Sequence, residues 1–319
     1  MPRAPANGIE LEYESFGHEQ ATPIVLIMGF ASQMIVWDEA FCRALANRGL
    51  RVIRFDNRDV GLSTKVDHLG TVNLGAALLA QRLGRPLAPP YTLDDMADDV
   101  AGLLDALGLT SAHVCGASMG GMIAQTLAFR RPDRVRSLTS IMSTTSDPEL
   151  PQAELRARGV LLEPAPVDRE GYAEHAVKVW RTIGSPGLLF DEERIRERGR
   201  RAFDRGIYPK GVVRQLTAMM VHGSRRERLR GVVAPTLVIH GEADPLIPVA
   251  GGQDTARCIV GARLVTLPDM GHDLPRPLWP RLVDEIDRHV RSTEGSATLS
   301  PGIQTTAAHA AGARHRRHP

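Results

Sequence analysis

Residues 114–122 read Val-Cys-Gly-Ala-Ser-Met-Gly-Gly-Met. The apolar run 111–116 before this turn is typical of a short strand, and residues 120–131 after it have a helical pattern that Pro132 ends. Glycines stand two residues before and two residues after Ser118, where they let the strand and helix backbones approach closely. A serine on such a sharp turn is held out of the fold. The stretch therefore predicts a serine nucleophile rather than a small-residue turn that only packs.

Two later stretches could supply the partners of this serine. The apolar run 235–241 leads to Asp244, and the run 262–267 leads to a loop that carries His272. Loops at the carboxyl ends of parallel strands gather at one edge of an open sheet. We therefore expect Ser118, Asp244 and His272 to meet at that edge.

Each of these assignments has an alternative. Glu242 could be the acid in place of Asp244, which could instead stabilise a turn before the following proline. Three other histidines compete with His272. We expect His240 to lie in a core strand, His289 to lie on the outer face of the last helix, and His222 to precede a surface stretch. His272 is thus the preferred base.

Taken together, these motifs resemble the α/β-hydrolase family over about residues 9–291. Residues 56–63, Asp-Asn-Arg-Asp-Val-Gly-Leu-Ser, are similar to that family's Asp-x-Arg-x-x-Gly-x-Ser turn. Within the family, the chain is most similar to the aclacinomycin methylesterase type of bacterial ester hydrolases. The resemblance implies that Ser118 is the nucleophile, His272 the base, and Asp244 the carboxylate that orients the base.

An oxyanion hole needs two main-chain N–H groups. The Met119 amide stands at the start of the predicted helix and is the first donor. The resemblance implies that the Phe30 amide, in the loop after strand 23–28, is the second. Relatives commonly have His-Gly where this chain has Met28-Gly29. Because backbone amides stabilise the oxyanion, the hole should survive this change, which affects only what holds the loop in place.

The resemblance implies an α/β fold with a mostly parallel eight-stranded sheet, flanking helices and a helical cap inserted after the sixth strand. We expect the core to comprise residues 1–144 and 231–291, the cap residues 145–230, and a disordered tail residues 292–319. The cap is expected because the strand pattern disappears there and three helical patterns replace it, at 172–183, 192–206 and 211–222.

Apolar residues of the cap are candidates for contact with a substrate, although most of them should only hold the cap together. The cap candidates are Trp180, Phe190, Phe203, Tyr208, Met219 and Met220. Methionines near the motifs suggest an adaptable apolar pocket. They are Met28, Met34, Met119 and Met122.

Composition excludes several classes of partner. The formal net charge is +2 over 319 residues, so we expect neither nucleic acid nor an anionic membrane as a partner. Three cysteines do not indicate a disulfide framework, and Cys115, next to the motif, is expected to be buried rather than catalytic. The start of the chain lacks a signal-peptide pattern, and no apolar run could span a bilayer. A cytoplasmic protein is expected.

The sequence and its resemblance therefore predict a cofactor-free and metal-free hydrolase. It would cleave small to mid-sized apolar carboxylic esters, such as methyl esters, through an acyl-enzyme intermediate. One alternative is a perhydrolase (cofactor-free haloperoxidase) that uses the same triad with peroxide in place of water. Another is a non-catalytic binding protein of the same fold. The sequence does not indicate an oligomeric state.

Overall fold

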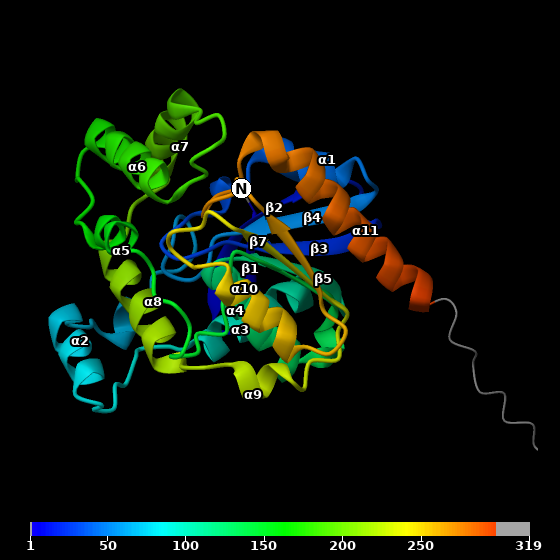
Figure 1. Cartoon of the computed structure of the whole chain (residues 1–319), viewed down its shortest axis with the longest axis horizontal. Coiled ribbons are helices and arrows are strands. Elements are labelled where there is room, and N and C mark those ends of the chain that lie inside the picture. The colour runs from blue at the N-terminus through cyan, green and yellow to red at the C-terminus, as the bar shows by residue number, and fades with distance from the viewer. Residues whose placement is uncertain (1, 298–319) are drawn as a thin grey trace, which may run out of the picture.

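The computed structural model describes residues 2–297, and its centre is an eight-stranded sheet (Figure 1). The strand order is β1-β2-β4-β3-β5-β6-β7-β8. β1 and β2 pair antiparallel, as do β2 and β4, whereas all later pairs are parallel. The predicted eight-stranded, mostly parallel sheet is confirmed. Its strands are β1 (Arg3–Ala6), β2 (Ile9–Phe16), β3 (Thr22–Ile27), β4 (Leu50–Phe55), β5 (Ala112–Ala117), β6 (Val135–Ile141), β7 (Thr236–Gly241) and β8 (Arg263–Leu267).

Helices cover both faces of this sheet, which explains why its central strands are continuously apolar. Alternate residues of β3 point to opposite faces: Val25 packs in one buried cluster and Leu26 in the other. The first cluster includes residues of α3 (Leu93–Ala106) and α4 (Met119–Arg130), and the second includes residues of α1 (Glu39–Ala46) and α11 (Trp279–Ala297). Figure 1 shows α1 and α11 on one side of the strands and α3, α4 and α10 (Ala250–Cys258) on the other.

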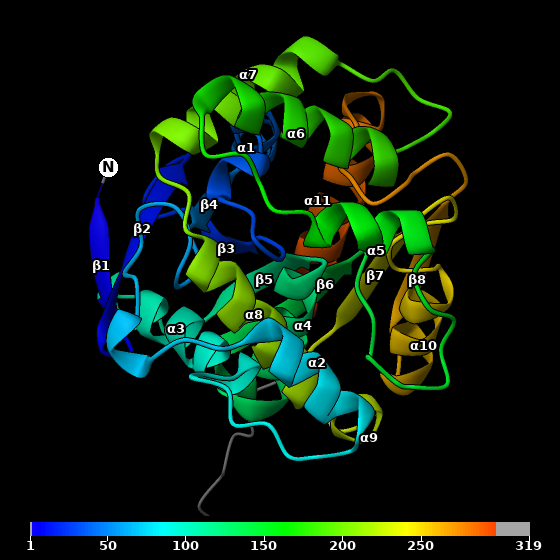
Figure 2. The ribbon, with the colours of Figure 1, turned by 90° about the vertical axis from the view of Figure 1, so that its left-hand side faces the viewer.

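Between β6 and β7 the chain leaves the sheet and forms helices, as expected for a cap. The three predicted helical patterns correspond to α6 (Arg169–Ile183), α7 (Glu192–Asp204) and α8 (Pro209–His222). The sequence did not predict α5 (Leu155–Leu162) or α9 (Arg226–Leu229). Figure 2 shows α5, α6, α7 and α8 gathered over one edge of the sheet.

Two further elements escaped prediction. The expected eight strands include an edge strand whose position, β1, the sequence did not identify. The sequence also did not predict α2 (Leu74–Arg82), which follows β4 and lies beside α8 in Figure 2.

The last helix, α11, continues to Ala297 and so extends beyond the expected core boundary at residue 291. The rest of the expected tail, residues 298–319, lies outside the described residues. Within residues 2–297, no helix is long and apolar enough to cross a membrane.

The expectation that His289 lies on the outer face of the last helix is wrong. Its side chain is buried, with 7% of the residue exposed, and its Nε2 lies 3.2 Å from the carbonyl oxygen of Leu138 in β6. Since a carbonyl oxygen only accepts, Nε2 carries the proton and donates. Burial lowers the pKa of His289 from its ordinary value of 6.5 to about 4. The folded protein therefore keeps this imidazole neutral.

This buried histidine predicts a pH-dependent stability. Between pH 6.5 and about 4 the unfolded chain binds a proton that the folded chain does not. The free energy of unfolding should therefore fall by about 2–3 kcal/mol as the pH drops through that window. The variant His289→Gln keeps a donor for Leu138 but cannot titrate. Urea unfolding of this variant should therefore show a smaller fall of the free energy of unfolding between pH 6.5 and about 4. The same substitution at the exposed His68 is the control. Equal pH dependence in His289→Gln and the wild type would contradict the assignment.

Candidate active site

Ser118 lies at a strained turn between β5 and α4. Its backbone has φ 57° and ψ −123°, a conformation that costs a non-glycine residue about 1–3 kcal/mol. The two flanking glycines make this turn possible. A Cβ on Gly116 would lie 2.1 Å from the Gly120 carbonyl oxygen, and a Cβ on Gly120 would lie 2.1 Å from the carbonyl oxygen of Ile27 in β3. Neither position can hold a larger residue without moving backbone.

The structure brings Ser118, His272 and Asp244 together. His272 Nε2 lies 3.0 Å from Ser118 Oγ, and His272 Nδ1 lies 2.7 Å from Asp244 Oδ2. The other carboxylate oxygen of Asp244 accepts the backbone N–H groups of Leu246 and Ile247, each at 2.8 Å. Because a carboxylate only accepts, His272 carries its proton on Nδ1. Its Nε2 is then free to accept the proton of the serine hydroxyl.

Electrostatics keep Asp244 ionised. Burial by itself would raise the pKa of this carboxyl group. The charge that His272 gains when it is protonated, together with the hydrogen bonds of His240 and His272, outweighs burial and lowers the pKa to about 2. Asp244 is therefore a carboxylate at neutral pH.

The competing residues lie elsewhere. Glu242 is exposed. His240 is fully buried, and its Nε2 donates to the carbonyl oxygen of Ile247 at 2.8 Å, as expected of a core histidine. Neither His222 nor His289 lines the cavity that contains Ser118.

The loop after β3 packs directly on the Ser118 turn. A Cβ on Gly29 would lie 3.0 Å from the Ser118 Cβ and 3.2 Å from the Ala117 carbonyl oxygen. Phe30, the next residue, lines the same cavity as Ser118. Met119, on the other side, is the first residue of α4. Of the two residues expected to form the oxyanion hole, Phe30 therefore lies near Ser118 in space, and Met119 follows it directly in the chain.

Two side chains that the sequence did not single out hold this loop. Asn57 Nδ2 donates to the Met28 carbonyl oxygen at 2.8 Å. Gln215, on the cap helix α8, accepts from the Ala31 N–H at 3.0 Å and donates to the Arg58 carbonyl oxygen at 3.1 Å. The loop is thus fixed although Met28 stands where relatives commonly have histidine.

The cap also contacts the loop that carries His272. The His272 N–H donates to the Ile183 carbonyl oxygen at 2.7 Å, and the Gly271 N–H donates to Ser185 Oγ at 2.9 Å. A Cβ on Gly271 would lie 2.3 Å from the Gly184 carbonyl oxygen. The segment after α6 therefore packs backbone to backbone against the His272 loop. Ser185 carries no motif that could have identified it from sequence.

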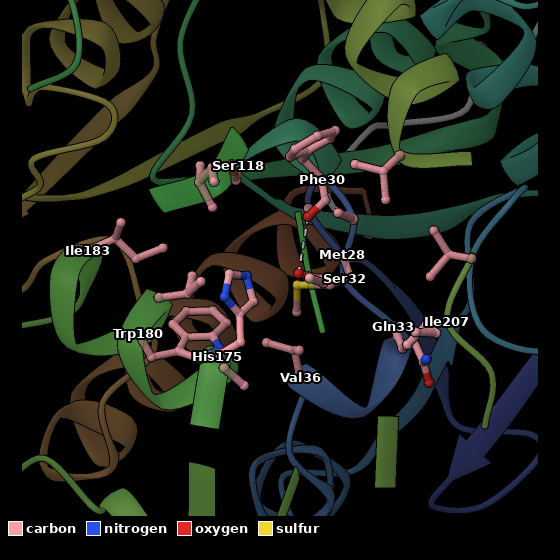
Figure 3. Close-up of a pocket in the computed structure, with 18 of the residues that line it drawn as sticks. Met28, Phe30, Ser32, Gln33, Val36, Ser118, His175, Trp180, Ile183 and Ile207 are labelled. Atoms are coloured by element: carbon pink, nitrogen blue, oxygen red, sulfur yellow. Dashed lines mark hydrogen bonds between the residues drawn. The ribbon is translucent and has the colours of Figure 1, made fainter. Parts of the chain in front are cut away.

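A cavity of about 370 Å³ lies between the cap and the sheet edge, and both Ser118 and His272 line it. Figure 3 shows part of its wall, formed by Met28, Phe30 and Ser32 of the loop, Ser118, and His175, Trp180 and Ile183 of the cap. Most of the accessible lining is apolar. The cavity therefore suits a small molecule with an apolar body.

The predicted lining residues are only partly correct. Trp180 and Tyr208 of the cap and Met28 of the loop do line the cavity, as does Met142, which was not predicted. The other candidates do not, because most of them pack inside the protein instead. The Phe203 ring centroid lies 6.0 Å from that of Tyr172, and the Phe190 ring centroid lies 5.2 Å from Arg181 Cζ. Met219 packs on the core, and Met34, Met119 and Met122 are buried. Met220 also lies outside the lining.

Other reactive groups lie outside this site. Cys115 is fully buried, as expected, and burial raises the pKa of its thiol. In the described part of the chain, no group of three or more His, Cys, Asp or Glu side chains could hold a metal ion.

The glycine contacts predict the outcome of a simple pair of substitutions. Gly116→Ala would push a methyl group into the Gly120 backbone, so the free energy of unfolding should fall by more than about 3 kcal/mol. Gly159→Ala is the control, because that exposed residue of α5 has open space around its Cα. Alanine there should be neutral or stabilise by up to about 1 kcal/mol. Urea unfolding measures both, and equal stabilities of the two variants would contradict the proposed packing.

Comparisons with known proteins agree with the observed fold. A family model described as alpha/beta hydrolase fold matches residues 22–275. The chain is 29% identical over 306 residues to rhodomycin D methylesterase DauP of Streptomyces sp. strain C5, an alignment that covers 89% of this chain and 96% of that protein.

Two solved structures are similar over nearly their whole length. The enol-lactonase from Burkholderia xenovorans LB400 has a TM-score of 0.64 and 26% identity, covering 93% of this chain and 98% of that chain. A thermophilic esterase from Thermogutta terrifontis has a TM-score of 0.67 and 25% identity, covering 92% and 98%.

Proposed function

The chain belongs to the alpha/beta hydrolase fold family, and on this premise we propose that it is a serine hydrolase of carboxylic esters. One observation carries the proposal, the unbroken hydrogen-bond chain from Asp244 through His272 to Ser118 at the wall of an apolar cavity. In this proposal Ser118 is the nucleophile, His272 the general base, and Asp244 the group that orients the base.

The first half of the reaction forms an acyl-enzyme. Ser118 Oγ attacks the ester carbonyl carbon while its proton passes to His272 Nε2, 3.0 Å away. Asp244 holds the imidazole in place and stabilises the imidazolium that forms. When the tetrahedral intermediate collapses, the bond from carbon to the alcohol oxygen breaks, and His272 gives its proton to the departing alcohol. The acyl group is left on Ser118.

The second half releases the acid. A water molecule attacks the acyl carbon and gives a proton to His272, and the proton returns to Ser118 Oγ as the bond to the serine breaks. In both halves the negative oxygen needs hydrogen-bond donors. We assign this role to the N–H groups of Phe30 and Met119, the second of which is also favoured by its place at the N-terminus of α4.

The cavity and the relatives support a proposal for the substrate class. DauP is a methylesterase, and the two similar structures are an enol-lactonase and an esterase. A cavity of about 370 Å³ with a mostly apolar lining suits the acid part of a small or mid-sized apolar ester. We therefore propose esters of small alcohols, such as methyl esters, as substrates.

The cap is proposed to comprise residues 145–230, with the core at 1–144 and, because α11 continues to Ala297, at 231–297 in place of 231–291. Its anchors to the core support this division and suggest that it excludes water from the acyl-enzyme. Arg214 of α8 contacts both carboxylate oxygens of Asp59, at 2.7 and 2.9 Å, and all of these side-chain groups are buried. Arg205 donates to the buried Asp56.

Three variants test the proposed triad. With a fluorophosphonate probe and a simple aryl ester, the wild type should be labelled at Ser118 and hydrolyse the ester, and Ser118→Ala should do neither. Asp244→Asn should lower kcat by about 10³–10⁴-fold, because the imidazole loses the partner that sets its tautomer. Glu242→Gln is the matched control, since that carboxylate lies two residues away and is exposed; its rate should stay within about twofold of the wild type.

Two results would contradict the proposal. One is a Glu242→Gln variant that loses as much activity as Asp244→Asn. The other is a folded wild type that the probe does not label, which would favour the non-catalytic binding protein.

A further inference from the structure

One face of the cap helix α6 forms a wall of the cavity. The residues of α6 that line it occupy positions i, i+3, i+4, i+7, i+8 and i+11, and so lie on one side of the helix. They are Tyr172, His175, Ala176, Val179, Trp180 and Ile183. The carbonyl oxygen of Ile183 accepts a hydrogen bond from the His272 N–H. The stripe therefore starts beside the proposed base, and His175 lies about 12 Å along the helix axis from that end.

This wall is apolar except toward the end that lies away from the proposed base, where His175 and Tyr172 lie one turn apart. Figure 3 shows the imidazole of His175 at the cavity beside Trp180. In the described residues, neither the imidazole nor the Tyr172 hydroxyl has a hydrogen bond or ion pair to another protein group. Both polar groups are thus available to a molecule in the cavity.

The other charged side chains of the cavity outside the triad are already committed to protein partners. Their carboxylates each accept from a neighbouring side chain, so a ligand would have to compete for them. These pairs are Asp59 with Arg214, Glu163 with Lys178 and Asp273 with Ser185.

The charge state of His175 decides which groups it could recognise. Burial lowers the pKa of His175, and the charge of Lys178 adds to this, although Glu163 opposes it. The imidazole is therefore neutral near pH 7 and offers one N–H donor and one nitrogen acceptor. A neutral hydroxyl or carbonyl group suits it better than a carboxylate does.

We infer that His175 is a specificity-determining residue, which hydrogen-bonds a hydroxyl or carbonyl group on the acid part of the ester while the apolar body packs along α6. The inference rests on the proposed function, because it places the ester group at Ser118. It predicts that the enzyme prefers an apolar ester that carries such a group over the same ester without it.

Matched substrates and variants test this inference. The probes are methyl biphenyl-4-carboxylate and its 3′-hydroxy and 4′-hydroxy derivatives. His175→Phe keeps a ring in the wall but removes both hydrogen-bonding nitrogens. Glu174→Ala is the control. Glu174 precedes His175 in the chain but does not line the cavity, and its carboxylate accepts from Arg196 Nε at 2.5 Å.

The wild type should have a kcat/KM about tenfold higher for at least one hydroxylated ester than for the parent ester. His175→Phe should lose this preference through a higher KM for the hydroxylated ester, while fluorophosphonate labelling shows that Ser118 still reacts. Glu174→Ala should keep the preference. The inference is overturned if the wild type shows no preference, if His175→Phe keeps it, or if that variant alone loses labelling. A wild type without labelling would instead contradict the proposed function.

Discussion

The close backbone contact between β5, α4 and β3 at the Ser118 turn is the constraint on which the rest of the site depends. No Cβ fits at Gly116 or Gly120, because at either position it would lie 2.1 Å from a carbonyl oxygen. The packing of these backbones holds Ser118 at a positive φ, which an isolated serine would avoid. The strain places the hydroxyl at the edge of the sheet, where the loops after β7 and β8 bring Asp244 and His272.

The cap contributes to the geometry of the reacting groups as well as covering them. Gln215 bonds the loop that carries Phe30, and Ser185 bonds the loop that carries His272. The backbone of Gly184 approaches Gly271 so closely that a side chain there would not fit. A movement of this segment would therefore displace the proposed base. The fold thus links the position of this segment of the proposed cap to the alignment of the proposed catalytic groups.

The meeting of Ser118, Asp244 and His272 could be predicted from the sequence because each of them belongs to a local pattern. Ser118 lies between glycines on a strand-to-helix turn, and Asp244 and His272 follow apolar strands. Parallel topology then brings these loops to one edge without further information. Asn57 and Gln215 could not be found in this way, because their role exists only once distant segments have packed together.

The errors have physical reasons too. His289 was placed on an outer helix face, although it stands three residues after the buried Ile286, and this spacing could have shown that it points inward. The pocket methionines were inferred from nearness in sequence to the motifs. Met119 is adjacent to Ser118, but its side chain points into the core rather than the cavity, because successive residues at a turn face different directions.

The most direct test of the account is to trap the covalent intermediate. The protein would be mixed with an activated aryl ester and quenched in acid within milliseconds, and its mass would then be measured before and after proteolysis. The account predicts a transient mass increase equal to the acyl group less the hydrogen that it replaces, located on the peptide that contains Ser118. Turnover with no adduct, or an adduct on a different residue, would contradict it.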